Sequence, residues 1–228
     1  LMRKPLLRNY YGLTLRHAML RLGLIKDSYV TIRCFDGSST QTTLYSVCKL
    51  IYSYVIGHVN GINCLGNSVR FFDGSLIPIS EIMFSDGIGD ALRYGWQYDA
   101  NNGYWFKDNI KFKHMHVTII ENFDLNQYGI LNVKDRIVVD VGAFVGDSAI
   151  YFAMKGARKV YAIEPHPGAY REMLENIELN NLKDRIILIN AALGSKRRII
   201  KIPSVGVDSA GAMYYGLSSS GNFKVPML

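Results

Sequence analysis

The sequence lacks a long uninterrupted hydrophobic run, the feature that a membrane-spanning helix requires. Such a helix takes about 20 consecutive apolar residues, and the most apolar early stretch, residues 42–59, is interrupted by Lys49 and His58. The N-terminus also lacks the order of a secretory signal, in which a basic start precedes an apolar block and a small-residue cleavage site. We therefore expect a cytoplasmic protein without a transmembrane helix.

Cysteine is scarce as well. The 228 residues contain three cysteines, Cys34, Cys48 and Cys64. Their odd number and wide spacing, without a CxxC pair or a histidine at ligand spacing, argue against a disulfide framework and a zinc site. Because free cysteine is among the residues most often buried, we predict three reduced, mostly buried cysteines and no metal site.

Acidic residues are rare at the start of the chain. The net charge is +7, and residues 1–33 carry seven Lys and Arg against Asp27 alone. Such a basic arm can attract nucleic acid, an anionic membrane surface or an acidic substrate, or it can be a solvated helix face. Apolar residues recur every three to four positions from Leu6 to Leu22, which predicts an amphipathic helix that ends at Gly23. This helix either packs on the protein or lies on a membrane surface.

Short apolar or β-branched runs then predict a mixed region with several strands. The predicted strands are residues 29–35, 68–72, 75–79 and 117–121. Asp73-Gly74 separates two of them and predicts a β-hairpin, because a tight hairpin turn needs positive φ angles. We assign residues 1–122 to an N-terminal α+β region with a basic amphipathic helix and no assigned role, and residues 123–228 to a second domain.

In this second domain, predicted strands alternate with predicted helices. The strands are residues 137–139, 160–163 and 186–189, and the helices are residues 146–155 and 168–180. Strands and helices that alternate at this spacing form a parallel sheet with right-handed crossovers. The fold class is therefore α/β, with a Rossmann-like parallel sheet.

The stretch RIVVDVGAFVGDSAIYF, residues 136–152, has the layout of a ligand-binding turn between a strand and a helix. The strand runs into Asp140, and Gly142 and Gly146 frame the turn. Glycine lets the backbone approach a ligand, and a helix N-terminus offers N–H groups with a partial positive charge. The next strand ends in Glu164, where a carboxylate is placed to accept both hydroxyls of an adenosine ribose.

The glycine spacing favours S-adenosylmethionine over a dinucleotide. A dinucleotide site prefers GxGxxG, whose second glycine lets the main chain approach a pyrophosphate. Here Phe144 stands at that position, between Gly142 and Gly146, and would obstruct a pyrophosphate. S-adenosylmethionine carries adenosine and an amino-acid tail without that group, so it fits the D-x-G-x-x-x-G form better.

The segments VVDVGAFVGDSAIYFAMKGARKVYAIEPHPGAYREMLENIELNNL and IILINAALGS resemble the FkbM family of S-adenosylmethionine-dependent methyltransferases. The resemblance covers roughly residues 123–195. It implies a class I methyltransferase fold with a seven-stranded sheet, and methyl transfer, usually to an oxygen of a small molecule or glycan.

The resemblance also implies a set of cofactor-binding residues. Those of the loop are Asp140, Gly142, Ala143, Phe144 and Gly146. Those that hold the ribose, lie beside the adenine or flank the base are Glu164, Pro165, His166, Asn190, Ala191 and Ala192. The FDLNQYG segment resembles the family's lead-in to this core, which makes Gln127 and Tyr128 candidates for the edge of the site.

Several of these residues have a purely structural alternative. Asp140 can serve as a turn residue, and Gly146 can serve helix packing alone. Phe144 can act as a hydrophobic cover over the sheet edge. His166 lies in a Pro-His-Pro turn, where a solvated histidine is the alternative to one beside the cofactor.

The family pattern is incomplete in this chain. The family's sheet needs further strands after Ala192, for which 36 residues remain, and its Lys-Ile-Asp-x-Glu-Gly type motif is absent. We therefore predict a sheet truncated after its third strand, in a fragment of a longer enzyme, with completion by a partner or oligomer as the alternative. We name no catalytic residue.

Three functions follow from this sequence. The first is methylation of an oxygen on a small molecule or glycan. The second is an RNA methyltransferase that uses the basic N-terminal arm. The third is a non-catalytic interaction protein on a nucleotide-binding fold, whose basic helix binds a membrane or a partner; fold alone does not decide between them.

Overall fold

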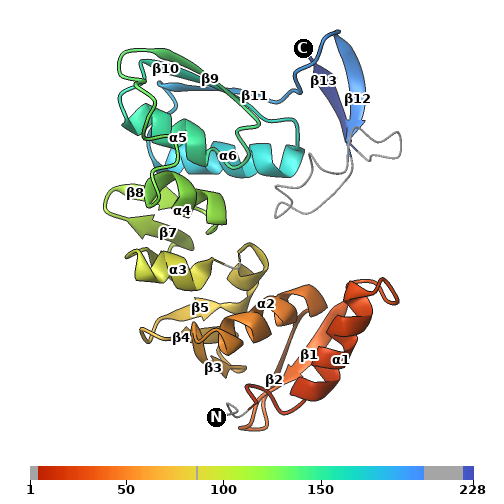
Figure 1. The fold of residues 1–228 in the computed structure, drawn as a ribbon. Helices are drawn as coiled ribbons and strands as arrows, with labels where there is room; N and C mark the ends of the chain where they lie inside the picture. Colours follow the sequence, from red (N-terminus) through yellow and green to blue (C-terminus); the bar gives the residue numbers. More distant parts are fainter. Residues whose placement is uncertain (1–4, 86, 203–222) are drawn as a thin grey trace. The chain divides into compact units, whose positions relative to one another are not determined.

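The computed structural model describes residues 5–85, 87–202 and 223–228 (Figure 1). The chain divides into two compact units, residues 1–100 and 101–228. The boundary expected from the sequence, between residues 122 and 123, falls inside the second unit. Each unit is described by itself.

The first unit combines helices with small antiparallel sheets. Its elements are α1 (Tyr10–Arg21), β1 (Tyr29–Arg33), β2 (Ser39–Thr43), α2 (Leu44–Val55), β3 (Val59–Asn63), β4 (Ser68–Phe71), β5 (Leu76–Pro78), η1 (Ile79–Met83), α3 (Ile88–Arg93) and β6 (Gln97–Asp99). β1 pairs with β2, and β4 lies between β3 and β5. The predicted hairpin is confirmed, with Val69 opposite Ile77, and Gly74 takes the positive φ of its turn.

The predicted N-terminal helix is α1, and it ends as expected. Gly23 has a φ of 71°, and the N–H of Leu24 donates to the carbonyl of Met19, as at a glycine-terminated helix end. The predicted apolar face is wrong in part, because Tyr11, Leu15 and Leu22 are 77%, 65% and 74% exposed. Leu6 and Leu7 of the predicted stripe are buried, but they precede the helix, which begins at Tyr10.

Two of the three cysteines are bonded, which corrects the prediction of three reduced cysteines. Cys34 and Cys64 form a disulfide with a Cα–Cα distance of 6.1 Å, and Cys48 is free and buried. Cys34 follows β1 and Cys64 follows β3, so the bond joins the ends of two strands whose cysteines are 30 residues apart in sequence. Wide spacing in the sequence hid this pairing, because the two segments meet only in the folded unit.

The second unit contains the parallel sheet. Its elements are β7 (Tyr104–Lys107), β8 (Ile110–Phe112), α4 (Val117–Phe123), β9 (Ile137–Val141), α5 (Asp147–Met154), β10 (Lys159–Ile163), α6 (Pro167–Leu179), β11 (Ile186–Ile189), β12 (Arg198–Ile202) and β13 (Phe223–Met227). The strand order is β11-β10-β9, with both pairs parallel. The predicted alternation and parallel sheet are thus confirmed.

The predicted strand over residues 117–121 is wrong, because this segment is the helix α4. Its residues Val117, Ile119 and Ile120 favour strands by local propensity. Ile119 and Ile120 are buried, and α4 packs against α5. Tertiary packing therefore overrides the local preference.

Helices α5 and α6 lie together along one face of the sheet, as Figure 1 shows. On β9, alternate side chains are left exposed: Ile137, Val139 and Val141 keep 54%, 59% and 55% of their surface. Within the described residues β9 pairs with β10 alone. This face and edge of the sheet are apolar and open.

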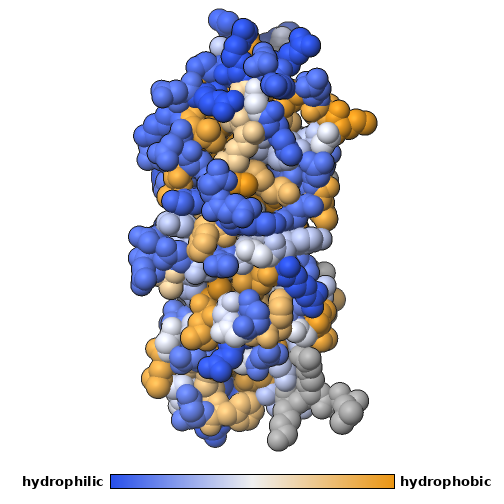
Figure 2. Space-filling view, turned by 90° about the vertical axis from the view of Figure 1, so that its left-hand side faces the viewer, coloured by the Kyte–Doolittle hydropathy of each residue, from blue (hydrophilic) through white to orange (hydrophobic). Residues whose placement is uncertain are grey.

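Hydrophobic residues reach the surface elsewhere too. The side of the molecule in Figure 2 shows them as small patches between hydrophilic side chains. Within the described ranges, no helix combines the length and the apolar composition needed to cross a membrane.

Candidate functional site

The loop between β9 and α5 has an unusual backbone. Gly142, Phe144 and Gly146 all take positive φ angles, of 78°, 48° and 85°. This region is accessible to glycine, but strained for a side chain such as that of Phe144. The N–H groups of Gly142 and Ala143 both donate to the carbonyl of Ile163, at 2.9 and 3.1 Å. These two backbone hydrogen bonds therefore hold the start of the loop against the end of β10.

Glu164, directly after β10, holds the next part of this loop. Its carboxylate accepts the Phe144 N–H at 3.0 Å and the His166 N–H at 2.7 Å. The residue is 7% exposed, and burial raises its pKa to about 7 despite these two hydrogen bonds. Each carboxylate oxygen keeps a further lone pair. Glu164 can therefore accept two more donors without giving up its contacts with the loop.

Asp140 lies near the end of β9, beside the first turn of α5. The Ser148 hydroxyl donates to its carboxylate at 2.6 Å. Burial raises the pKa of Asp140, and the hydrogen bond from Ser148 opposes that shift. The structure thus brings Asp140 and Glu164 to the carboxyl ends of neighbouring strands, as predicted for a ligand site at this edge of a parallel sheet.

The two framing glycines differ in what surrounds them. A Cβ built on Gly142 would meet no atom within 4 Å, whereas one on Gly146 would lie 2.8 Å from Cγ of Met173 on α6. Gly142 therefore borders open space where a ligand can approach. Gly146 is required at least for the close packing of the loop on α6.

Pro165 and His166 lead from β10 into α6. His166 is buried, and its Nδ1 accepts the N–H of Ala169 at 3.3 Å, so it caps the helix. Its ring packs edge-on against Phe223, with ring centroids 5.7 Å apart. The ring is therefore neither solvated nor loose, and its backbone N–H, rather than its side chain, contacts Glu164.

Asn190, Ala191 and Ala192 follow β11 on the same side of the sheet. The amide of Asn190 donates to the carbonyl of Glu164 at 2.7 Å. Ala191 is buried, and Ala192 forms a bridge to Met227 of β13. Asn190 thus fixes the backbone at Glu164, which is the role that the geometry assigns to it.

The two candidates for the edge of the site are placed differently. Gln127 is exposed. Tyr128 packs on Phe152 of α5, with ring centroids 5.1 Å apart. Burial raises its pKa, and the charges of Asp140, Asp147 and Glu121 act in the same direction.

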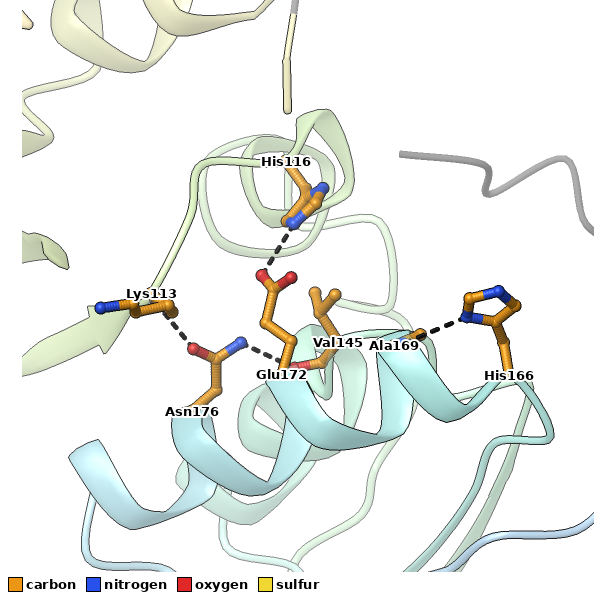
Figure 3. A network of polar contacts seen from close by, with 7 residues as sticks. All are labelled: Lys113, His116, Val145, His166, Ala169, Glu172 and Asn176. Atoms are coloured by element: carbon orange, nitrogen blue, oxygen red, sulfur yellow. Dashed lines mark hydrogen bonds and ion pairs between the residues drawn. The ribbon is translucent and has the colours of Figure 1, made fainter. Parts of the chain in front are cut away.

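A buried polar cluster next to the loop was missed by the sequence analysis, and Figure 3 shows three of its members, His116, Glu172 and Asn176. Its members outside the motif are His116, Asn122, Glu172 and Asn176, and Asp147 begins α5 within it. Asn122 donates to Asp147 at 2.7 Å, and burial raises the pKa of Asp147 to about 6. One signal could have indicated part of it: Glu172 and Asn176 share the helical spacing of Ala169, Met173 and Ile177, which is the buried face of α6.

The residues present fit an adenosine-containing cofactor. Glu164 has acceptor capacity for two ribose hydroxyls, and Gly142 borders open space. Phe144, in a strained conformation, occupies the place where a dinucleotide site needs glycine. These features agree with S-adenosylmethionine and disagree with a pyrophosphate.

Known proteins share this part of the chain. Residues 130–200 match the TRM5/TYW2 methyltransferase domain family. A segment of 54 residues is 44% identical to the ribosomal protein L11 methyltransferase of Carboxydothermus hydrogenoformans, covering 24% of this chain and 18% of that protein. A segment of 56 residues is 39% identical to the tRNA(Phe) (4-demethylwyosine(37)-C(7)) aminocarboxypropyltransferase of Pyrococcus horikoshii, covering 25% and 20%.

Among solved structures, Pyrococcus horikoshii TYW2 in complex with MeSAdo aligns with a TM-score of 0.34 and 20% identity, over 65% of this chain and 48% of that chain. The chain spans about a fifth of the length of the curated relatives it matches. Residues 130–200 thus resemble a methyltransferase domain, and the parallel sheet and glycine loop of this part of the chain agree with a class I fold that takes S-adenosylmethionine as its cofactor.

Proposed function

We propose that this protein transfers a methyl group from S-adenosylmethionine to an acceptor. The observation that carries the proposal is Glu164, buried at the end of β10 with spare acceptor capacity and fixed by the amides of Phe144 and His166. Asp140 and the loop after β9 complete the same edge of the sheet. This arrangement is the one expected for the ribose of an adenosine cofactor.

The cofactor, when bound, supplies an activated methyl group. The protein supplies binding and orientation, which can account for much of the rate of a two-reactant step. Glu164 would hold the ribose hydroxyls, Gly142 would allow close approach of the ligand, and Asn190 would keep the Glu164 backbone in place. The general base and the acceptor pocket stay unassigned.

For the acceptor we propose an oxygen of a small molecule or glycan. The support is the resemblance of residues 123–195 to the FkbM family. This resemblance specifies the acceptor more narrowly than the match to a methyltransferase domain does. Phe144, Pro165 and His166 stay predictions as cofactor contacts on the same basis. The cytoplasmic location likewise stays a prediction.

RNA is the second candidate acceptor. Arg8, Arg16, Lys26 and Arg33 are exposed on the first unit, and exposed basic side chains bind phosphates. One relative is named for its action on tRNA(Phe). RNA binding by this arm would weaken steeply with salt, because phosphate contacts release counterions.

The helix α1 supports a third hypothesis, which is binding to an anionic membrane surface. Tyr11 and Leu15 are exposed on α1, which also carries the exposed Arg16, a combination that suits an interfacial helix. Co-sedimentation with anionic vesicles, lost when Arg8 and Arg16 are changed to Glu, would favour this role.

The proposal is tested by following label from S-adenosylmethionine that carries a tritiated methyl group. The protein is incubated with hydroxylated small molecules, glycans or total RNA in separate reactions, with Glu164→Ala as the matched inactive control. We expect label in the glycan or small-molecule fraction. Label in RNA alone would favour the second candidate acceptor. The proposal would be contradicted if the protein bound the cofactor but labelled none of the three kinds of acceptor.

A further inference from the structure

A histidine and a glutamate form a buried pair beside the cofactor loop. His116 Nε2 and Glu172 Oε1 are 2.8 Å apart, and the two residues are 3% and 6% exposed. His116 stands directly before α4, and Glu172 lies in the middle of α6. Figure 3 shows the carboxylate rising from α6 toward the imidazole.

The imidazole also contacts the loop. The rings of His116 and Phe144 meet edge-on, with centroids 5.0 Å apart and planes at 78°. Phe144 has a φ of 48°, a conformation that costs about 1–2 kcal/mol for a residue with a side chain. Such a conformation persists only where the surroundings hold it. The ring of His116, which meets the Phe144 ring, and the carboxylate of Glu164, which accepts the Phe144 N–H, are contacts that can hold Phe144.

α6 holds the loop at the next residue as well. Asn176, one turn after Glu172, donates to the carbonyl of Val145 at 2.9 Å and is fully buried. Glu172 therefore acts on Phe144 through His116, and Asn176 acts on Val145 directly. Two consecutive loop residues are fixed from one helix face.

We infer that His116, oriented by Glu172, positions Phe144 so that its N–H stays on Glu164, and thereby sets the affinity for the adenosine ribose. The inference rests on the proposed function and adds two positioning residues from outside the motif. A buried polar pair contributes little net stability over apolar residues of equal volume. An apolar pair would fill the space but would not fix the edge of a ring against Phe144, which is what the hydrogen bond does.

The test compares variants that separate this role from folding. Glu172→Gln keeps an oxygen acceptor for His116, whereas the double variant His116→Phe/Glu172→Met fills the site with apolar side chains and removes the hydrogen bond. Glu178→Gln is the matched control, since Glu178 is on the same helix but pairs at the surface with Lys183. Binding of S-adenosylhomocysteine is measured by calorimetry, and Tm is measured without ligand.

We expect Glu172→Gln and Glu178→Gln to bind within about threefold of the unchanged protein. The double variant should bind at least tenfold more weakly while its Tm stays within a few degrees, which a purely structural role would not produce. Equal binding by the double variant would overturn the inference.

Hydrogen exchange without ligand keeps the test independent of the proposed function. If the unchanged protein fails to bind S-adenosylhomocysteine, the proposed function fails, and the exchange of a peptide that covers residues 142–147 still decides the positioning role. Faster exchange of this peptide in the double variant, with unchanged exchange of β10 and β11, supports it. Unchanged exchange in the loop overturns it.

Discussion

At the scale of single residues, Glu164 carries both the shape of the loop and the expected contact with the ribose. It is a buried carboxylate whose two hydrogen-bond donors are backbone N–H groups of the loop and of the turn after β10. Burial outweighs these donors and raises its pKa to about 7. Its ionisation therefore falls in the range where a ligand and pH can compete for it.

The affinity for S-adenosylhomocysteine should rise as the pH rises from about 5.5 to 8. Ribose hydroxyls donate to the ionised carboxylate, so binding below pH 7 must release the proton of Glu164, whose pKa is raised to about 7. Calorimetry in buffers of different ionisation enthalpy should detect proton release on binding near pH 6. Above pH 8, where Glu164 is already ionised, no proton release is expected. An affinity that does not change across this range would contradict the role of Glu164.

The same pKa affects the protein without ligand. Because the folded pKa lies above that of an unfolded glutamate, Glu164 contributes stability that is complete at low pH and is lost as the pH rises through about 7. Asp147, raised to about 6, acts with the same sign. The difference in Tm between the unchanged protein and Glu164→Gln isolates the first contribution, and Glu164→Gln should gain relative stability between about pH 4.5 and 7, the interval between the unfolded and folded pKa values.

Gly146→Ala should destabilise the protein more than Gly142→Ala. Both have a positive φ, which costs about 1–2 kcal/mol with a side chain. Only the Cβ at Gly146 would approach Met173, at 2.8 Å from its Cγ, which adds an overpacking cost of about 1 kcal/mol or more. Urea unfolding measures both values, and equal losses would mean that the packing of the loop on α6 is looser than described.

The site residues near the glycine motif could be predicted from the sequence, and their partners could not. Asp140 and Gly142 lie at the end of one strand and Glu164 lies at the end of the next, so a parallel sheet brings them to one edge. His116 contacts Glu172 across 56 residues, and no local pattern connects them. Only a polar residue on an apolar helix face, such as Asn176, gives a sign of such a contact.

At the scale of elements, α6 is joined to the segment after β7 by two asparagines. Asn176 accepts the Lys113 N–H at 2.7 Å, and Asn180 accepts the Lys111 N–H at 3.0 Å. The two are one turn apart on the helix. They therefore connect the helix that supports the loop with the strand β8 and the chain just after it.

Asn176→Ala should cost more stability than Asn180→Ala. Asn176 is fully buried, so its loss leaves the Val145 carbonyl and the Lys113 N–H without it, at about 1–3 kcal/mol for each unsatisfied buried group. Asn180 is only partly buried, so water can replace it. Thermal unfolding of both variants measures the difference, and an equal loss would argue against the buried position of Asn176.

The disulfide gives a prediction for the first unit. Thiol counting under denaturing conditions should find one free cysteine, Cys48, and three after reduction. The double variant Cys34→Ser/Cys64→Ser should lose up to about 4 kcal/mol, since the bond closes a long loop in the unfolded chain. Three free thiols in protein purified without reductant would restore the sequence-based expectation.

Periodicity predicted the elements of the parallel sheet well. β11 has the predicted bounds, and α5 and α6 lie within one or two residues of theirs. The failure at α4 has a physical cause: seven residues are too few for a periodic signal, and contact with α5 decides their conformation. The prediction of three reduced cysteines failed for a related reason, because Cys34 and Cys64 meet only through contacts between segments distant in sequence.

At the scale of the whole molecule, the chain combines a methyltransferase cofactor unit with a separate α+β unit. The sequence predicted the class of the fold and its cofactor; the second compact unit begins at Asn101. The sheet of this unit exposes Ile137, Val139 and Val141 on β9. An open apolar face of this kind is normally covered in class α/β folds, whose parallel sheets are buried on both sides.

The measurement that tests the central claim most directly is calorimetric titration of the 228-residue chain with S-adenosylhomocysteine, alongside NAD and the Glu164→Ala variant. We expect micromolar binding of S-adenosylhomocysteine, no binding of NAD, and at least a tenfold loss in the variant, since hydrogen bonds to a charged group contribute about 1.5–3 kcal/mol. Binding of NAD without binding of S-adenosylhomocysteine would contradict the account.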